Sequence, residues 1–264
     1  MNKKFVRVIS LLTAILMLFA LCSCGAETEE ETELQYKSAA PVTKQEIVDR
    51  FNAVLAAAIN GTPAVSYSLD QGAKDPKCDN KYVKASFKTI AKEVTAEKFG
   101  ESTEYGESAK LILPVHGTEA AGKVDISSVR TATITDNKAD DTYTIIITLY
   151  SESNPQQNGS QYGKLYKIDT QEEILKNFEV IKDFAIIKSF NTNYGIGKIK
   201  AVIYKETDNV KTLELSREVK VDTEITGVGK LASIGENLPL SFTYTSTEKY
   251  DINWDNPDTD GLEK

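Results

Sequence analysis

Apolar and polar positions recur along this chain with two different periods, and the change of period separates predicted helices from predicted strands. Between Thr43 and Pro63 the apolar residues recur every three or four positions, which is the spacing of one face of an α-helix. Thr43 and Glu46 have the spacing of a capping box, and Gly61 stands where the apolar pattern stops. The segment therefore predicts an amphipathic helix with defined ends.

Two further helices are predicted from the same period. One runs from Asn80 to about Phe99 and carries a single apolar stripe. The other, which is shorter, follows Asp169, where Thr170 and Glu173 repeat the capping-box spacing. Each predicted helix has one apolar face and is expected to pack that face on apolar surface.

Period two dominates the remaining apolar segments and predicts strands with one buried and one solvated face. The clearest alternation runs over residues 143–149, 213–225 and 240–252, and the turn residues Thr207 to Asn209 predict a hairpin. Further strands are predicted at residues 64–69, 110–115, 124–135 and 184–190. Most of the predicted strands follow one another along the chain, with few helices between them. This order favours an antiparallel α+β fold over alternating βαβ units.

We therefore expect a folded domain at residues 42–254, an antiparallel β-sheet meander packed on one face by two or three amphipathic helices. Its two halves, about 42–152 and 165–254, are weakly similar in sequence, since both have a Gly-Lys pair, an alternating strand, an Asp-Asn turn and a second strand. Two hairpins with the same turn residues have similar sequences even when they do not arise by duplication. One domain and two similar halves both remain open.

The N-terminus has the pattern of a secretory signal peptide. Lys3, Lys4 and Arg7 precede an uncharged apolar run from Val8 to Leu21. A membrane-spanning helix needs about 20 predominantly apolar residues, and this run is shorter and ends in small residues. A removable signal at residues 1–23 is the preferred interpretation.

The sequence Leu21-Cys22-Ser23-Cys24 resembles the lipobox of bacterial lipoproteins, in which a Leu stands three residues before a lipid-modified Cys. The resemblance covers only residues 1–24 and implies that Cys24 carries the lipid. Cys22 fits less well, because bulky Leu21 would then adjoin the cleaved bond. The lipobox resemblance also implies a bacterial membrane location, with the protein anchored by lipid outside the cytoplasmic membrane.

The mature chain, residues 24–264, has 28 basic and 39 acidic residues and a net charge of −11. Such a charge disfavours nucleic acid and anionic headgroups as partners. Residues 24–41 include five glutamates between Glu27 and Glu33 and predict an acidic, flexible tether. Residues 255–264 predict a polar tail.

No residue constellation for catalysis, cofactor binding or metal binding stands out. Cys78 has no predicted disulfide partner, and His116 is the only histidine in the chain. Neither residue has a recognisable catalytic companion in the sequence, so Cys78→Ala and His116→Ala are expected to leave function unchanged. The tail resembles the first half of a calcium loop between Asn256 and Gly261, but the chain ends at Lys264, before the closing glutamate.

Three function classes remain. The first is a noncatalytic surface lipoprotein that binds a protein or an envelope polymer. The second carries a lipid or other apolar ligand in a cavity between sheet and helices, by analogy with half-barrel envelope lipoproteins at the level of the fold alone. An envelope hydrolase is the third, and the sequence offers it the least support.

Overall fold

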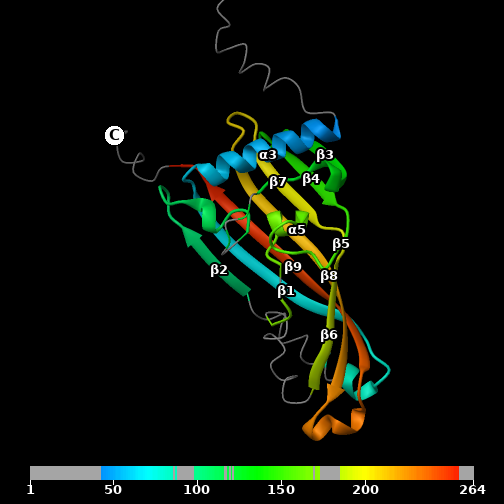
Figure 1. The fold of residues 1–264 in the computed structure, drawn as a ribbon. Helices are drawn as coiled ribbons and strands as arrows, with labels where there is room; N and C mark the ends of the chain where they lie inside the picture. The colour runs from blue at the N-terminus through cyan, green and yellow to red at the C-terminus, as the bar shows by residue number, and fades with distance from the viewer. Residues whose placement is uncertain are drawn as a thin grey trace, which may run out of the picture. The chain divides into compact units, whose positions relative to one another are not determined.

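The computed structural model describes residues 43–85, 87, 98–115, 118, 120, 122–168, 170–172 and 185–255. The chain divides into two units, residues 1–40 and 41–264, and all the described residues belong to the second. Among them, nine antiparallel strands form one sheet, in which seven strands follow the order β2-β1-β9-β8-β7-β4-β3 (Figure 1). The strands are β1 (Ala64–Lys77), β2 (Lys98–Thr103), β3 (Val129–Asn137), β4 (Thr142–Leu149), β5 (Glu152–Ser153), β6 (Ala185–Tyr194), β7 (Lys198–Tyr204), β8 (Val210–Gly227) and β9 (Leu238–Asn253).

Strand β8 is the central element of this sheet. One edge of β8 pairs with β9 over nearly its whole length, and the other edge pairs first with β7 and then with β6. Between β6 and β7 the chain leaves the ladder, but Gly195 N still donates to the carbonyl oxygen of Glu218 in β8 at 2.8 Å. A Cβ at Gly197 would lie 2.9 Å from the Tyr162 hydroxyl oxygen, so only glycine fits this close approach.

Helix α3 (Lys44–Asn60) begins at the predicted capping box, which the structure confirms: Thr43 Oγ1 accepts from Glu46 N, and the Glu46 side chain accepts from Thr43 N. Its inward face buries Ile47, Val48, Phe51, Val54, Leu55 and Ala58. Figure 1 shows α3 crossing the sheet at β4 and β7. Full burial of each large apolar side chain contributes about 1.5–3 kcal/mol.

A polar contact fixes α3 against the hairpin between β7 and β8. Arg50 Nε lies 2.6 Å from Tyr143 Oη, and the Arg50 guanidinium also pairs with Asp208 in the hairpin turn. Tyr143 Oη donates to Asp208 Oδ1 at 2.7 Å. The helix is thereby joined to β4 and to a turn more than 150 residues later in the sequence.

The predicted alternation is confirmed on the long strands. Residues 143, 145, 147 and 149 of β4 are buried, as are the predicted apolar positions of β8 and β9. The turn at Asp208 connects β7 to β8 as the hairpin pattern predicts. The coarse expectation of an antiparallel sheet with a few helices is correct.

One predicted strand and two predicted boundaries are wrong. Residues 110–115 form no strand: a short 3-10 turn (Ala109–Leu111) leads to Pro114, whose missing N–H cannot continue a ladder. The strand predicted at 124–135 starts only at Val129, after a second 3-10 turn (Ile126–Ser128). The helix predicted to reach Phe99 ends earlier, because Phe99 lies in β2 and pairs with Leu69.

Other predictions fall on residues outside the described ranges. The helix expected from Asn80 is helical over residues 81–85 and at residue 87, and the rest of that segment is not described. The helix expected after Thr170 is described only at residues 171–172. A short helix that the sequence did not predict, α5 (Gln161–Leu165), begins where Ser160 Oγ accepts from Gly163 N.

Candidate functional site: a polar groove on the solvated sheet face

An open groove of about 390 Å³ lies at the end of the sheet where β1, β9, β8 and β6 run side by side. The strand register places one row of side chains across it. Lys77 is opposite Ser241, Ser241 is opposite Asp222, and Asp222 is opposite Asn191. Four strands therefore contribute one polar side chain each to the same row.

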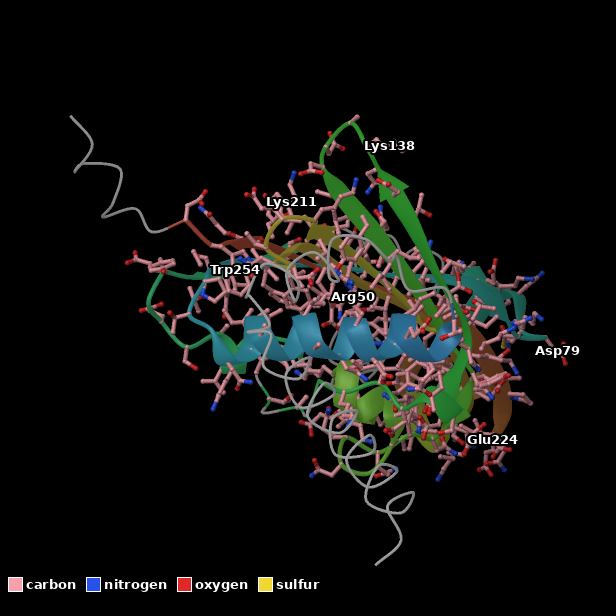
Figure 2. The ribbon with its side chains drawn as sticks, turned by 90° about the horizontal axis from the view of Figure 1, so that it is seen from above. Arg50, Asp79, Lys138, Lys211, Glu224 and Trp254 are labelled. Atoms are coloured by element: carbon pink, nitrogen blue, oxygen red, sulfur yellow. The ribbon has the colours of Figure 1, made fainter. Side chains whose placement is uncertain are left out.

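A second row and a wall complete the groove. Ser189 is opposite Glu224, and Glu224 is opposite Pro239. Cys78 and Asp79, which follow β1 directly, lie along the groove as well. Figure 2 shows Asp79 and Glu224 at the same end of the domain. Most of the lining residues are polar, because this surface is the solvated face of the alternating strands.

The groups in the groove match a hydrophilic ligand. Lys77 is opposed by three carboxylates, those of Asp79, Asp222 and Glu224, so the lining is net acidic. Asp222 also pairs with Lys220 at 2.8 Å on the exposed surface. Hydroxyl and amide side chains supply both donors and acceptors. An uncharged or cationic ligand is therefore favoured over an anionic one.

The opposite, inward face of the same strands holds a buried ion pair. Arg217 Nη1 donates to Glu248 Oε1 at 2.6 Å, and the two side chains are 1% and 2% exposed. Arg217 Nη2 donates to the carbonyl oxygen of Lys167 at 2.9 Å, and the guanidinium lies 5.3 Å from the centroid of the Tyr166 ring. Tyr250 Oη lies 2.8 Å from Glu248 Oε2 and 2.8 Å from the carbonyl oxygen of Pro114.

Burial keeps the nearby phenols neutral. Desolvation raises the pKa of Tyr250 and of Tyr166 well above its ordinary value, and the negative charge of Glu248 adds to the effect. Tyr162 lies next to Tyr166, with the two ring centroids 5.3 Å apart, and burial raises the pKa of Tyr162 to about 12. Tyr162 Oη accepts from Gly197 N at 2.7 Å and donates to the carbonyl oxygen of Gly195, so it closes the gap between β6 and β7.

A buried serine hydroxyl belongs to the inward cluster. Ser246 Oγ is buried and makes no hydrogen bond with any described residue. Ser246 lies directly opposite Arg217 in the β8–β9 ladder. Sequence reasoning missed this cluster, although a signal existed: Arg217, Ser246 and Glu248 all occupy core-facing positions of otherwise apolar alternation.

The residues singled out from sequence do not come together. Cys78 is a half-buried free thiol at the groove. Cys24, His116 and the tail from Asn256 onward lie outside the described residues. Within the described ranges, no group of three or more His, Cys, Asp or Glu side chains is arranged to hold a metal ion. None of the described helices is both long enough and apolar enough to cross a membrane.

Comparison of the chain with known proteins found no relative. No family model matches the chain, and neither the curated proteins nor the solved structures contain a significant match.

Proposed function

We propose that this chain is a noncatalytic bacterial lipoprotein, anchored outside the cytoplasmic membrane by lipid on Cys24, whose domain binds a hydrophilic envelope polymer. The observation that supports the binding role is the groove. It presents hydroxyl, amide and carboxylate groups from four adjacent strands on one solvated surface. A glycan with hydroxyl, amide and amine groups matches this set of donors and acceptors, whereas a polyanion would meet the acidic lining.

The noncatalytic assignment rests on how one buried and one partly buried carboxylate are used. Glu248 is held by Arg217 and Tyr250, and Asp208 is held by Arg50 and Tyr143. A carboxylate whose oxygens are engaged in these contacts orders its neighbours, which favours a structural role over proton transfer.

A carrier of apolar ligands is the second candidate. It requires helices over the same sheet face as α3, and we propose that the segments following Asn80 and Thr170 provide them. The arrangement of α3 supports that cover, while the buried ion pair of Arg217 and Glu248 disfavours an apolar ligand in the middle of that face.

Sedimentation with insoluble, purified peptidoglycan tests the proposed function on the full chain. We expect Asn191→Trp to fill the groove and lower the affinity by about tenfold, equivalent to about 1.4 kcal/mol. Asn193→Trp is the matched control, because Asn193 is also exposed on β6, two residues further along, but does not line the groove. The control is expected to bind like the unmodified chain.

Two results would contradict the proposal. One is equal loss of binding in both tryptophan variants, which would place the ligand elsewhere. The other is the absence of peptidoglycan binding together with transfer of a fluorescent phospholipid between vesicles, which would favour the carrier. Purified teichoic acid, a polyanion, serves as the probe for charge and is expected not to compete.

A further inference from the structure

Strand β3 is an edge of the sheet. It pairs with β4 on one side, and no described strand pairs with its other side. Thr131, Thr133 and Thr135 are exposed on β3. An edge strand of this length presents a row of N–H and C=O groups to which another strand can be added.

The ladder shows which residues present those groups. Leu149 N donates to Gly197 O on the β7 side of β4, whereas Tyr150 N donates to Ser128 O on the β3 side. Because the direction alternates along a strand, the even residues of β4 bond to β3. The even residues of β4 are opposite Thr131, Thr133 and Thr135. The backbone N–H and C=O groups of these three threonines therefore form hydrogen bonds with β4.

The intervening residues Ala132, Ile134 and Asp136 therefore direct their N–H and C=O groups outward. When a second β3 is placed antiparallel with Thr133 on the two-fold axis, Ala132 of one copy is opposite Ile134 of the other. Both residues point outward, so they form a hydrogen-bonded pair, and the outward backbone groups of both copies are satisfied. Thr133 then faces its own copy as a non-hydrogen-bonded pair.

The charges on β3 are complementary to themselves in this register. Arg130, which lies at the register shift between Val129 and Thr131, comes next to Asp136 of the other copy at the end of the paired segment, and the symmetry repeats the contact. A parallel, in-register pairing would instead bring Arg130 to Arg130 and Asp136 to Asp136. Asp136 has capacity for a second cation, because its side chain is 53% exposed and shares the single ammonium of Lys205 with Asp141.

We propose that β3 is a self-association edge, at which two copies of this chain pair antiparallel over residues 130–136 about Thr133. The contact joins the two sheets into one continuous sheet. Seven residues from each copy make a small interface, so the dimer is weak and forms at high protein concentration. This inference goes beyond the proposed function and does not depend on it.

Disulfide trapping tests the register. The background is a cysteine-free full chain that carries Cys22→Ala, Cys24→Ala and Cys78→Ala. In this background, Thr133→Cys places two thiols at a pair whose Cα atoms are about 4.5 Å apart, within disulfide range. The matched control is Thr135→Cys, which is exposed on the same strand, but whose two copies lie about 14 Å apart along the ladder. After mild oxidation, only Thr133→Cys is expected to give a covalent dimer above the background of the cysteine-free chain.

A mixture of Thr131→Cys and Thr135→Cys chains provides an independent check, since residues 131 and 135 are opposite each other in the proposed register. We expect a disulfide between the two different chains in the mixture. Equal cross-linking of Thr133→Cys and Thr135→Cys would overturn the register. No cross-linking in any of these samples would overturn the self-association edge itself.

The charge argument has its own test. Arg130→Asp in the Thr133→Cys chain puts like charges opposite each other twice, and is expected to lower the dimer yield by about threefold or more. Lys138→Asp is the control: it makes the same change in net charge at an exposed residue of the β3–β4 turn, outside the paired segment (Figure 2). An equal decrease in both variants would show that general charge repulsion, and not the Arg130–Asp136 contact, controls the association.

Discussion

Replacing Arg217 by methionine is expected to destabilise the domain strongly, although methionine preserves most of the side-chain volume. The substitution removes the donor to Glu248 Oε1 and the donor to the Lys167 carbonyl oxygen. It leaves the Glu248 carboxylate 2% exposed, with its contact to Tyr250 Oη but without a countercharge from Arg217. A buried charge that loses its partner cannot regain the hydration that it lost on folding.

The expected loss is about 3–5 kcal/mol in the free energy of unfolding, the range for breaking a fully buried pair from one side. The double variant Arg217→Met with Glu248→Leu removes both charges. Because Tyr250 Oη still has the Pro114 carbonyl oxygen at 2.8 Å, the phenol keeps a partner, and the double variant is expected within about 1 kcal/mol of the unmodified chain. The two substitutions are thus strongly non-additive.

Urea unfolding of the four chains measures this cycle. Far-UV circular dichroism reports the sheet, and fluorescence reports Trp254, the only tryptophan, whose Nε1 donates to the Val210 carbonyl oxygen at 2.8 Å. The reasoning is refuted if Arg217→Met costs less than about 1 kcal/mol, or if the double variant loses the sum of the two single losses. Either result would mean that the pair is not a closed, desolvated unit.

Three further predictions concern pH, anchoring and the start of the domain. The pKa of Tyr162 is raised from 10 to about 12, so the unfolded chain loses this proton first and the free energy of unfolding falls as the pH rises from 10 to 12. Tyr162→Phe should make this fall shallower by about 1.4 kcal/mol per pH unit. An unchanged slope in urea unfolding measured across this pH range would contradict the assignment. Cys24→Ala should leave unprocessed precursor and abolish partitioning into the detergent phase, while Cys22→Ala should not; release by Cys22→Ala alone would refute the lipobox assignment. Limited proteolysis of the mature chain should trim the glutamate-rich tether and stop close to Thr43, and protection extending back to Glu27 would argue against a flexible tether.

The sequence identified strands wherever one buried face produced an apolar alternation, as in β4 and β8. It missed β2, whose sequence Lys98–Thr103 has little apolar alternation and which is a strand because it pairs with β1. It also missed α5, a five-residue helix that contains a glycine and depends on a cap from Ser160. Both elements are determined by contacts with distant or neighbouring segments, which a periodicity cannot report.

The groove was beyond sequence reasoning for a related reason. Lys77 and Ser241 become neighbours only through the register of β1 against β9, and Asn191 joins them only through β8. The buried ion pair was within reach, since Arg217 and Glu248 stand in phase with apolar neighbours. A search for apolar residues alone passes over such positions, and asking which polar residues share the buried phase would have found them.

The pairing of β1 with β9 has a consequence for how the chain reaches its native state. Ala64 is opposite Asn253 in the ladder, so β1 can pair early with β2 on one edge but finds its partner on the other edge only when the last strand has been made. Loop closure over so long a separation is slow, and the early strand stays available for wrong pairings in the meantime. For the exported lipoprotein that we propose, this long separation delays completion of the sheet until almost the whole polypeptide has crossed the membrane.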